Sequence, residues 1–204
     1  MELSVVFAFI GTIFLVSVSP GLCMTLSMSL GIRLGVRKTL WMMLGELLGV
    51  ASVTTAAIVG VAALLLADPL VFTVFKWLGA AYLFYMGWQT WQAEPTPPEQ
   101  IATGATHSRL ALASQGFITA VSNPKAWAFL AALMPPFINQ DAPLLPQMLI
   151  FLGIILIVEF MCLLLYAQGG RAFNRFLHKR GKAQWLTKVS GALMFFVGVW
   201  LLFS

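Results

Sequence analysis

Two acidic residues lie inside long apolar stretches of the sequence, where an ionised side chain is hardest to accommodate. Glu46 is embedded in the stretch 41–49 and Glu159 in the stretch 154–162. A charged side chain that faces lipid is energetically costly, so we expect both carboxyl groups to face a bundle interior or a wet cavity. There each is a candidate proton carrier, and the alternative is a structural carboxyl group paired with a nearby cation.

Two basic residues also lie away from the loops that carry the other positive charges. Lys125 directly follows a proline in the middle of one apolar stretch, and Lys76 lies about two helical turns into another. Lys76 could extend its ammonium group to the outer membrane surface, pair with Glu46, or bind a substrate carboxylate. Lys125 has less freedom to reach a surface, so it is the stronger candidate for binding a carboxylate.

Proline interrupts two of the apolar stretches. One contains Ser19-Pro20-Gly21, and the other contains Ser122-Asn123-Pro124. Proline removes a backbone donor and clashes with the preceding turn, so both helices should kink or break there. A break exposes N–H groups that can bind a carboxylate and carbonyl groups that can bind an ammonium ion. Pro20, Gly21 and Pro124 are therefore predicted helix breaks around a zwitterion site that includes Asn123, and a packing kink without a ligand is the alternative.

These residues must be positioned by helices that cross a membrane. Of the 204 residues, 60% are hydrophobic and only 9% are charged, too few charges to cover a water-soluble globule. This composition excludes secreted proteins, nucleic-acid-binding proteins and ordinary cytosolic enzymes. Apolar windows of about 20 residues predict six transmembrane helices. The six run from about Leu3 to Pro20 or as far as Gly31, then Thr39 to Leu66, Pro69 to Trp91, Leu110 to Met134, Pro146 to Gln168 and Trp185 to Phe203.

The remaining basic residues all lie in alternate loops. Three lie between the first two spans, Arg109 lies between the third and fourth, and six lie between the fifth and sixth or at the start of the sixth. The opposite loops hold Asp68 and Asp141 and no basic residue. By the positive-inside rule the basic loops are cytoplasmic, and both termini are predicted to be periplasmic. The net charge of +5 then reflects insertion and contact with anionic lipid, with no nucleic-acid partner.

The two halves of the chain resemble each other. At a constant offset of 112, five of thirteen positions coincide between 76–88 and 188–200, and Glu46 and Glu159 fall 113 apart. Three spans in each half is an odd number, so the second half must insert upside down relative to the first. We predict an all-α integral membrane protein of six transmembrane helices, a 3+3 inverted repeat with helices 1 and 4 broken. The single transporter domain 1–204 would comprise half-repeats of about 1–91 and 110–204 and a linker at 92–109, although coincidence among common apolar residues is the alternative.

No catalytic or metal-binding pattern stands out in the sequence. Cys23 and Cys162 form no CxxC pair, and His107 and His178 fall in predicted loops. No Walker-type phosphate loop and no Ser-His-Asp arrangement can be assembled. We therefore expect no enzyme activity, no cofactor, no bound metal and no use of ATP by this chain.

Together these motifs resemble the LysE/RhtB amino-acid exporters of the LysE superfamily. The resemblance rests on Ser19-Pro20-Gly21, on Gly45-Glu46, on 76–87 and on 123–126, and it covers nearly the whole chain. It implies a multi-pass exporter of amino acids or related small zwitterionic metabolites in the bacterial inner membrane, driven by the proton-motive force. Its partners would be the amino acid, protons and membrane lipid, and a homodimer is compatible with the sequence.

Two positions depart from the usual pattern of that family. Leu22 stands where family members usually carry a second proline, and Glu46 stands where an aspartate is common. The missing proline would soften the first break, and the longer acid would shift a bound cation by about one methylene group. The resemblance therefore does not carry a particular substrate over to this chain.

Two other functions are compatible with the same features. A membrane thiol-redox carrier that resembles the DsbD/CcdA type would use one cysteine from each half beside a proline break. Cys23, three residues after Pro20, suits that role, but no cysteine lies near Pro124, and Cys162 lies in the fifth span instead. A heavy-metal or inorganic-cation exporter that uses the two glutamates is the other alternative.

Overall fold

The computed structural model is helical throughout the residues that it describes, which are 3–19, 21–67, 69–92, 108–139, 141–177 and 182–203. The α-helices are α1 (Leu3–Val18), α2 (Leu22–Leu34), α3 (Val36–Ala67), α4 (Pro69–Gln92), α5 (Arg109–Val121), α6 (Pro124–Leu133), α7 (Leu144–Leu177) and α8 (Lys182–Phe203), with a 3-10 turn η2 (Pro135–Phe137). No strand occurs among these residues. Most of the predicted linker at 92–109 lies outside them.

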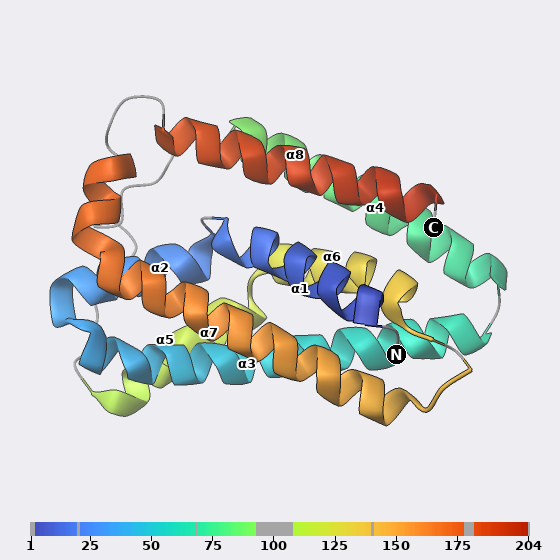
Figure 1. The fold of residues 1–204 in the computed structure, drawn as a ribbon, viewed down its shortest axis with the longest axis horizontal. Helices are drawn as coiled ribbons and strands as arrows, with labels where there is room; N and C mark the ends of the chain where they lie inside the picture. The colour runs from blue at the N-terminus through green and yellow to red at the C-terminus, as the bar shows by residue number, and fades with distance from the viewer. Residues whose placement is uncertain are drawn as a thin grey trace.

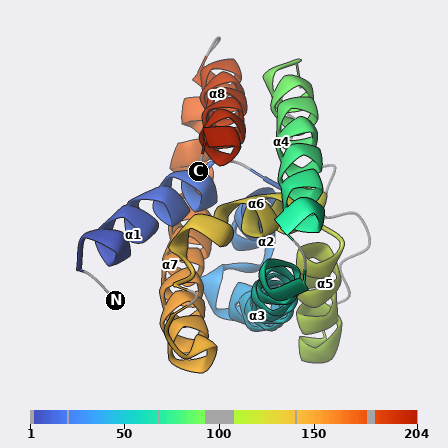
Figure 2. The ribbon, with the colours of Figure 1, turned by 90° about the vertical axis from the view of Figure 1, so that its right-hand side faces the viewer.

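The helices form a bundle in which α6 holds a central place. The pair α4 and α8 lies side by side on one flank, as Figure 1 shows. Figure 2 shows α6 between this pair and the group formed by α2, α3 and α7, and α6 packs against α3, α4 and α8. The short α6 therefore separates two regions of the bundle.

Two of the described helices are long and apolar enough to cross a membrane. These are Val36–Ala63 within α3 and Leu144–Gly170 within α7. The pair Val6–Val18 and Leu22–Leu34 passes the same test together with a bend of 57°, which gives three spans if the pair counts as one. These helices are consistent with the predicted all-α membrane protein, whereas the six spans and the repeat stay predictions.

The helix α7 is longer than the apolar window that predicted it. It ends at Leu177, nine residues beyond the predicted Gln168. An apolar window detects only the part of a helix that lies in hydrocarbon. Alanine and arginine are good helix formers, so the backbone can continue as a helix after the apolar stretch has ended.

Both proline motifs interrupt a helix. The first gap separates Val18 from Leu22, and the second separates Val121 from Pro124. Pro124 takes the first position of α6, where its missing N–H is not needed. Gly21 is the N-cap of α2, and Pro20 lies outside the described residues.

Side chains from elsewhere satisfy backbone carbonyl groups that the interruptions leave open. The Tyr166 hydroxyl donates to the carbonyl oxygen of Val18 at 2.8 Å, and Trp127 Nε1 donates to that of Val121 at 2.8 Å. Irregular backbone at membrane depth persists only where protein or water satisfies it. These bonds therefore stabilise both breaks.

The helices α3 and α5 approach so closely that the glycines at their contact have no room for a side chain. A Cβ atom built on Gly45 would overlap the carbonyl group of Ala113, and one built on Gly116 would overlap that of Met42. Small residues allow this approach, which adds dispersion contacts between membrane helices. The Gly45–Gly49 spacing on α3 thus serves helix packing, and that packing holds Glu46 beside α5.

Substituting alanine for Gly45 is expected to lower the free energy of unfolding by about 3 kcal/mol, because the added methyl group meets rigid backbone. The control is Gly60→Ala on the same helix, where nothing lies within 4 Å of the added atom. This control should keep or raise stability, since alanine is the better helix former. Thermal unfolding of the two purified variants in detergent measures the difference, and equal midpoints would contradict the tight α3–α5 packing.

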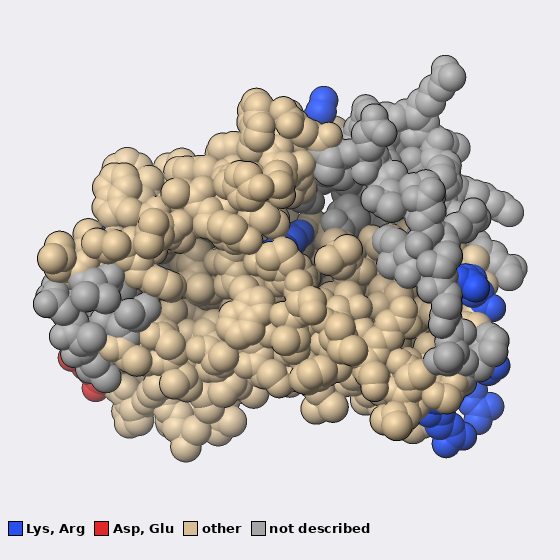
Figure 3. Space-filling model, turned by 180° about the vertical axis from the view of Figure 1, so that it is seen from behind, with Lys and Arg blue, Asp and Glu red and all other residues tan. Residues whose placement is uncertain are grey.

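Figure 3 shows basic residues gathered at one end of the bundle and acidic atoms at the other, with a few further basic atoms on the flank between them. Exposed basic residues at one end are Arg33, Arg37, Lys38 and Arg109, and Asp141 lies in the loop before α7 at the other end. The Arg109 guanidinium lies 5.2 Å from the ring centroid of Trp41, which joins the starts of α3 and α5. The flanks between the two ends are mostly apolar, as expected for a lipid-facing surface.

Candidate functional site

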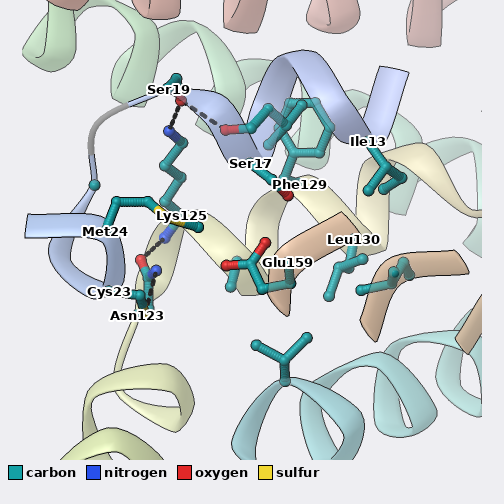
Figure 4. A pocket seen from close by; sticks show the side chains of 15 residues that line it. Ile13, Ser17, Ser19, Cys23, Met24, Asn123, Lys125, Phe129, Leu130 and Glu159 are labelled. Atoms are coloured by element: carbon teal, nitrogen blue, oxygen red, sulfur yellow. Dashed lines mark hydrogen bonds between the residues drawn. The ribbon is translucent and has the colours of Figure 1, made fainter. Parts of the chain in front are cut away.

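The two helix breaks meet at one cavity, shown in Figure 4. Its volume is about 80 Å³, which is space for several water molecules. Ser19 and Gly21 line it from the first break, Asn123 and Lys125 from the second, and Glu159 from α7. Most of the other lining residues are apolar, among them Val50, Phe129, Leu130 and Ile155.

Lys125 connects the start of α6 with the end of α1. Its ammonium group donates a hydrogen bond to Ser19 Oγ, which donates in turn to the carbonyl oxygen of Val16 at 2.7 Å (Figure 4). An ammonium group has three N–H donors, so two remain for other partners. The lysine can therefore hold the two breaks together and still bind an anion in the cavity.

The positive ends of two half-helices face the same cavity. Gly21, Cys23 and Met24 at the start of α2 line it, and so do Asn123 and Lys125 at the start of α6. The first N–H groups of a helix and its dipole favour negative charge at this end. Gly21 supplies no side-chain cap to α2, so these N–H groups are open to a ligand.

Asn123 organises the start of α6 and reaches across to α2. Its side-chain oxygen accepts the backbone N–H of Lys125 at 3.1 Å. Its Nδ2 donates toward Cys23 Sγ at 3.9 Å. The asparagine thus caps one half-helix and contacts the other, which sets the distance between the two positive helix ends.

The two glutamates of the apolar stretches differ in position and in burial, since Glu46 is buried and Glu159 is half-buried. Glu159 lines the cavity, with Ser17 and Lys125 as neighbours. Glu46 does not line it: its side chain is 0% exposed on α3, beside Cys23 and Glu159. No described residue makes a hydrogen bond of good geometry to either Glu46 oxygen. A buried carboxyl group without such partners is costly, which is the situation in which protonation or a transient ligand becomes favourable.

The structure brings four of the sequence-predicted site residues to one cavity and places Glu46 and Lys76 outside it. Glu159, Lys125, Asn123 and Gly21 line the central cavity, and Glu46 lies behind its wall. Lys76 instead lines a second cavity of about 310 Å³ with residues of α4, α6 and α8.

Sequence reasoning did not assign roles to several residues of the site. Ser17 and Ser19 contribute hydroxyl groups, and Phe129 and Ile155 contribute apolar wall. Ser19 belongs to the proline motif and could have been found by that signal, whereas Ser17 carries none, since serines are common in membrane helices. Within the described ranges, no three His, Cys, Asp or Glu side chains are grouped so that they could hold a metal ion.

Known proteins are similar to this chain over nearly its full length. Residues 14–204 match the family model described as LysE type translocator. The homoserine/homoserine lactone efflux protein of Salmonella typhimurium is 31% identical over 195 residues, which are 96% of this chain and 94% of that protein. The leucine efflux protein of Salmonella choleraesuis is 30% identical over 192 residues, 93% of this chain and 89% of that protein. An uncharacterized membrane protein of Vibrio cholerae is 29% identical over 202 residues, 98% of each chain, and no solved structure matches.

Proposed function

The chain belongs to the LysE type translocator family, and from this premise we propose that it exports a small zwitterionic amino acid or related metabolite by secondary transport. We place it in the bacterial inner membrane, driven by the proton-motive force. The observation that carries the proposal is the pairing of Lys125 and Glu159 in one cavity at two helix breaks. Relatives named for efflux of homoserine and of leucine support the substrate class.

The substrate carboxylate would bind at the basic side of the cavity. Lys125 supplies two N–H donors there, and the open start of α2 supplies backbone donors. Hydrogen bonds between charged partners are roughly twice as strong as neutral ones, so this side selects an anionic group. The Lys125–Ser19 bond would yield to the carboxylate, because Ser19 Oγ is a neutral acceptor.

The substrate ammonium group would bind at the acidic side. Binding of an ammonium group needs an ionised acceptor within the cavity, and Glu159 supplies one beside the Ser17 hydroxyl. The substrate side chain would then lie against the apolar wall formed by Val50, Phe129 and Ile155. A cavity of about 80 Å³ holds water rather than an amino acid, so binding requires α2 and α6 to move apart.

Proton coupling would arise because a proton and an ammonium group compete for the same carboxylate. Lys125 balances one negative charge, so a site with two ionised glutamates keeps one charge without a partner. A proton on one of them removes this excess, whereas a zwitterionic substrate adds no net charge and its ammonium group displaces a proton from Glu159. Protonation from the periplasmic side would therefore favour substrate release, and deprotonation on the cytoplasmic side would favour substrate binding.

The proposed transport cycle uses a 3+3 inverted repeat of the halves 1–91 and 110–204. Helix packing supports it, since each interrupted helix packs against the long helix of the opposite half. The pieces α1 and α2 contact α7, and the pieces α5 and α6 contact α3. Such packing between the two halves is expected of a transporter that works by alternating access around a site near the bilayer midplane. We place the end with Arg37 and Lys38 in the cytoplasm and both termini in the periplasm.

Purified protein in vesicles with an acidic lumen is expected to accumulate labelled amino acid inside, against its gradient. One coupled proton and a difference of one pH unit support an accumulation of about tenfold. Homoserine and leucine are the first amino acids to test, because two relatives are named for the efflux of these compounds. Accumulation should disappear when a protonophore collapses the pH difference. If no amino acid of a full panel enters the acidic vesicles, the proposed function is wrong.

A further inference from the structure

The second cavity combines one cation with an otherwise apolar lining. Its volume is about 310 Å³, and among the described residues that line it Lys76 alone is charged, beside apolar groups such as Gly79, Ala131 and Leu201. Lys76 is half-buried, and within the described part of the chain no hydrogen bond or ion pair is found for its ammonium group. A ligand that matches this lining is therefore an anion that carries an apolar tail.

The cavity opens toward the flank of the bundle rather than toward its ends. Leu78 is 65% exposed, and Tyr82 and Trp127 are each 39% exposed, although all three line the cavity. These side chains lie on the lipid-facing surfaces of α4 and α6. A molecule in the cavity would therefore enter from the bilayer.

The position of Lys76 along α4 places lipid headgroups within reach of its ammonium group. It lies seven residues after Pro69, which is about 10 Å along the helix from the end opposite the basic residues. The lysine stem can extend its ammonium group over a further distance of that order toward the interface. From Lys76 the cavity continues past Gly79 to Tyr82, deeper in the bilayer. Headgroup and chain would thus lie in the order that a phospholipid of the outer leaflet presents.

We propose that this cavity binds an anionic phospholipid of the outer leaflet, with its phosphate on Lys76 and one acyl chain between α4 and α6. A second copy of the chain fits less well. The described acids are Glu46 and Glu159 in the interior and Asp141 in a loop, so none of these three lies on an apolar flank where it could reach Lys76 of a neighbouring protomer. Lipid supplies both the negative charge and the apolar tail.

The lipid would contact the same helix that carries the substrate site. Ala126, Phe129 and Leu130 of α6 line the central cavity, whereas Trp127, Ala128 and Ala131 line the second one. The short α6 is therefore a wall shared by the two cavities. A bound acyl chain would support α6 from the side opposite the substrate.

Quenching of Trp127 fluorescence by brominated lipid tests the proposal. The full chain is reconstituted in phosphatidylcholine vesicles that contain either brominated phosphatidylglycerol or brominated phosphatidylcholine. The Trp127 signal is the difference between the unmodified protein and Trp127→Phe. We expect phosphatidylglycerol to quench at a mole fraction about fivefold lower, which is the gain expected from one basic residue near an anionic headgroup.

Two variants at the cavity and one control variant make the result specific to it. Lys76→Gln should abolish the preference for phosphatidylglycerol, whereas Lys188→Gln, an exposed lysine on α8, should keep it. Ala131→Phe should lower quenching by both lipids, because it fills the cavity. Native mass spectrometry of retained phosphatidylglycerol measures the same effects independently of tryptophan substitution.

Four results would overturn the lipid site. Equal quenching by the two lipids, or an unchanged preference in Lys76→Gln, would show that Lys76 binds no headgroup. Loss of a dimer in Ala131→Phe, seen by light scattering, would assign the cavity to a second copy. Transport that falls equally in vesicles with and without phosphatidylglycerol in Lys76→Gln would assign this lysine to the substrate.

Discussion

Replacing Lys125 by methionine is expected to lower amino-acid transport by about 100-fold, the effect of removing one partner of a buried charged pair worth about 3 kcal/mol. The methionine side chain has a similar length but no charge, so it removes the anion-binding group and the bond to Ser19. It also leaves Glu159 without its neighbouring cation. The substrate concentration at half-maximal rate should rise, because the carboxylate loses its charged partner. Initial rates of labelled-substrate uptake into vesicles measure both quantities.

The matched control is Lys188→Met, which removes an exposed positive charge from α8. It should transport at close to the rate of the unmodified protein. Thermal unfolding of both variants separates a lost binding group from a lost fold. If Lys125→Met folds and transports normally, Lys125 does not bind substrate, and the zwitterion site is wrong.

Replacing Glu46 by glutamine is expected to abolish accumulation driven by a pH difference while exchange of internal for external substrate continues. Glutamine keeps the shape of the side chain but cannot carry the proton, and Glu46 lies outside the cavity wall that contacts substrate. The tenfold accumulation expected at a difference of one pH unit should fall to about equal concentrations. Parallel measurements of accumulation and of exchange in the same vesicles distinguish the two activities.

The Glu159→Gln variant should differ from Glu46→Gln, because Glu159 lines the cavity. We expect it to lose exchange as well as accumulation, since the substrate ammonium group loses its partner. Asp141→Asn, in an exposed loop, is the control and should retain both activities. Accumulation that persists in Glu46→Gln would exclude Glu46 as the proton carrier.

Features of the fold that depend on local chemistry could be predicted from the sequence. The break at Pro124 is one, because proline clashes with the turn that precedes it wherever it lies in a helix. The cap by Asn123 and the close packing of Gly45 also follow from residue type at a given position. The full length of α7 could not be predicted in this way, since glycines, arginines and an asparagine interrupt the apolar stretch after Gln168.

The relative positions of the charged residues depended on tertiary structure. Lys76 and Lys125 are equally anomalous in an apolar stretch, yet one faces the second cavity and the other faces the central one. Glu46 and Glu159 match in sequence position, yet only Glu159 lines the cavity. The rotation of each helix about its axis decides these outcomes, and that rotation follows from packing against helices far away in sequence.

Residue types and their spacing were enough to predict that lipid surrounds this chain and that proline interrupts two apolar helices. They also predicted that four charged residues lie where the bilayer disfavours charge. Those conclusions follow from composition and from backbone chemistry, which act locally. Only the tertiary structure decided that both interruptions meet at one cavity, with Lys125 and Glu159 in it and Ser17 and Ser19 beside them. Packing of α1 and α2 against α7 and of α6 against α3 produces this arrangement, because close packing of side chains from distant segments sets where each polar group can lie.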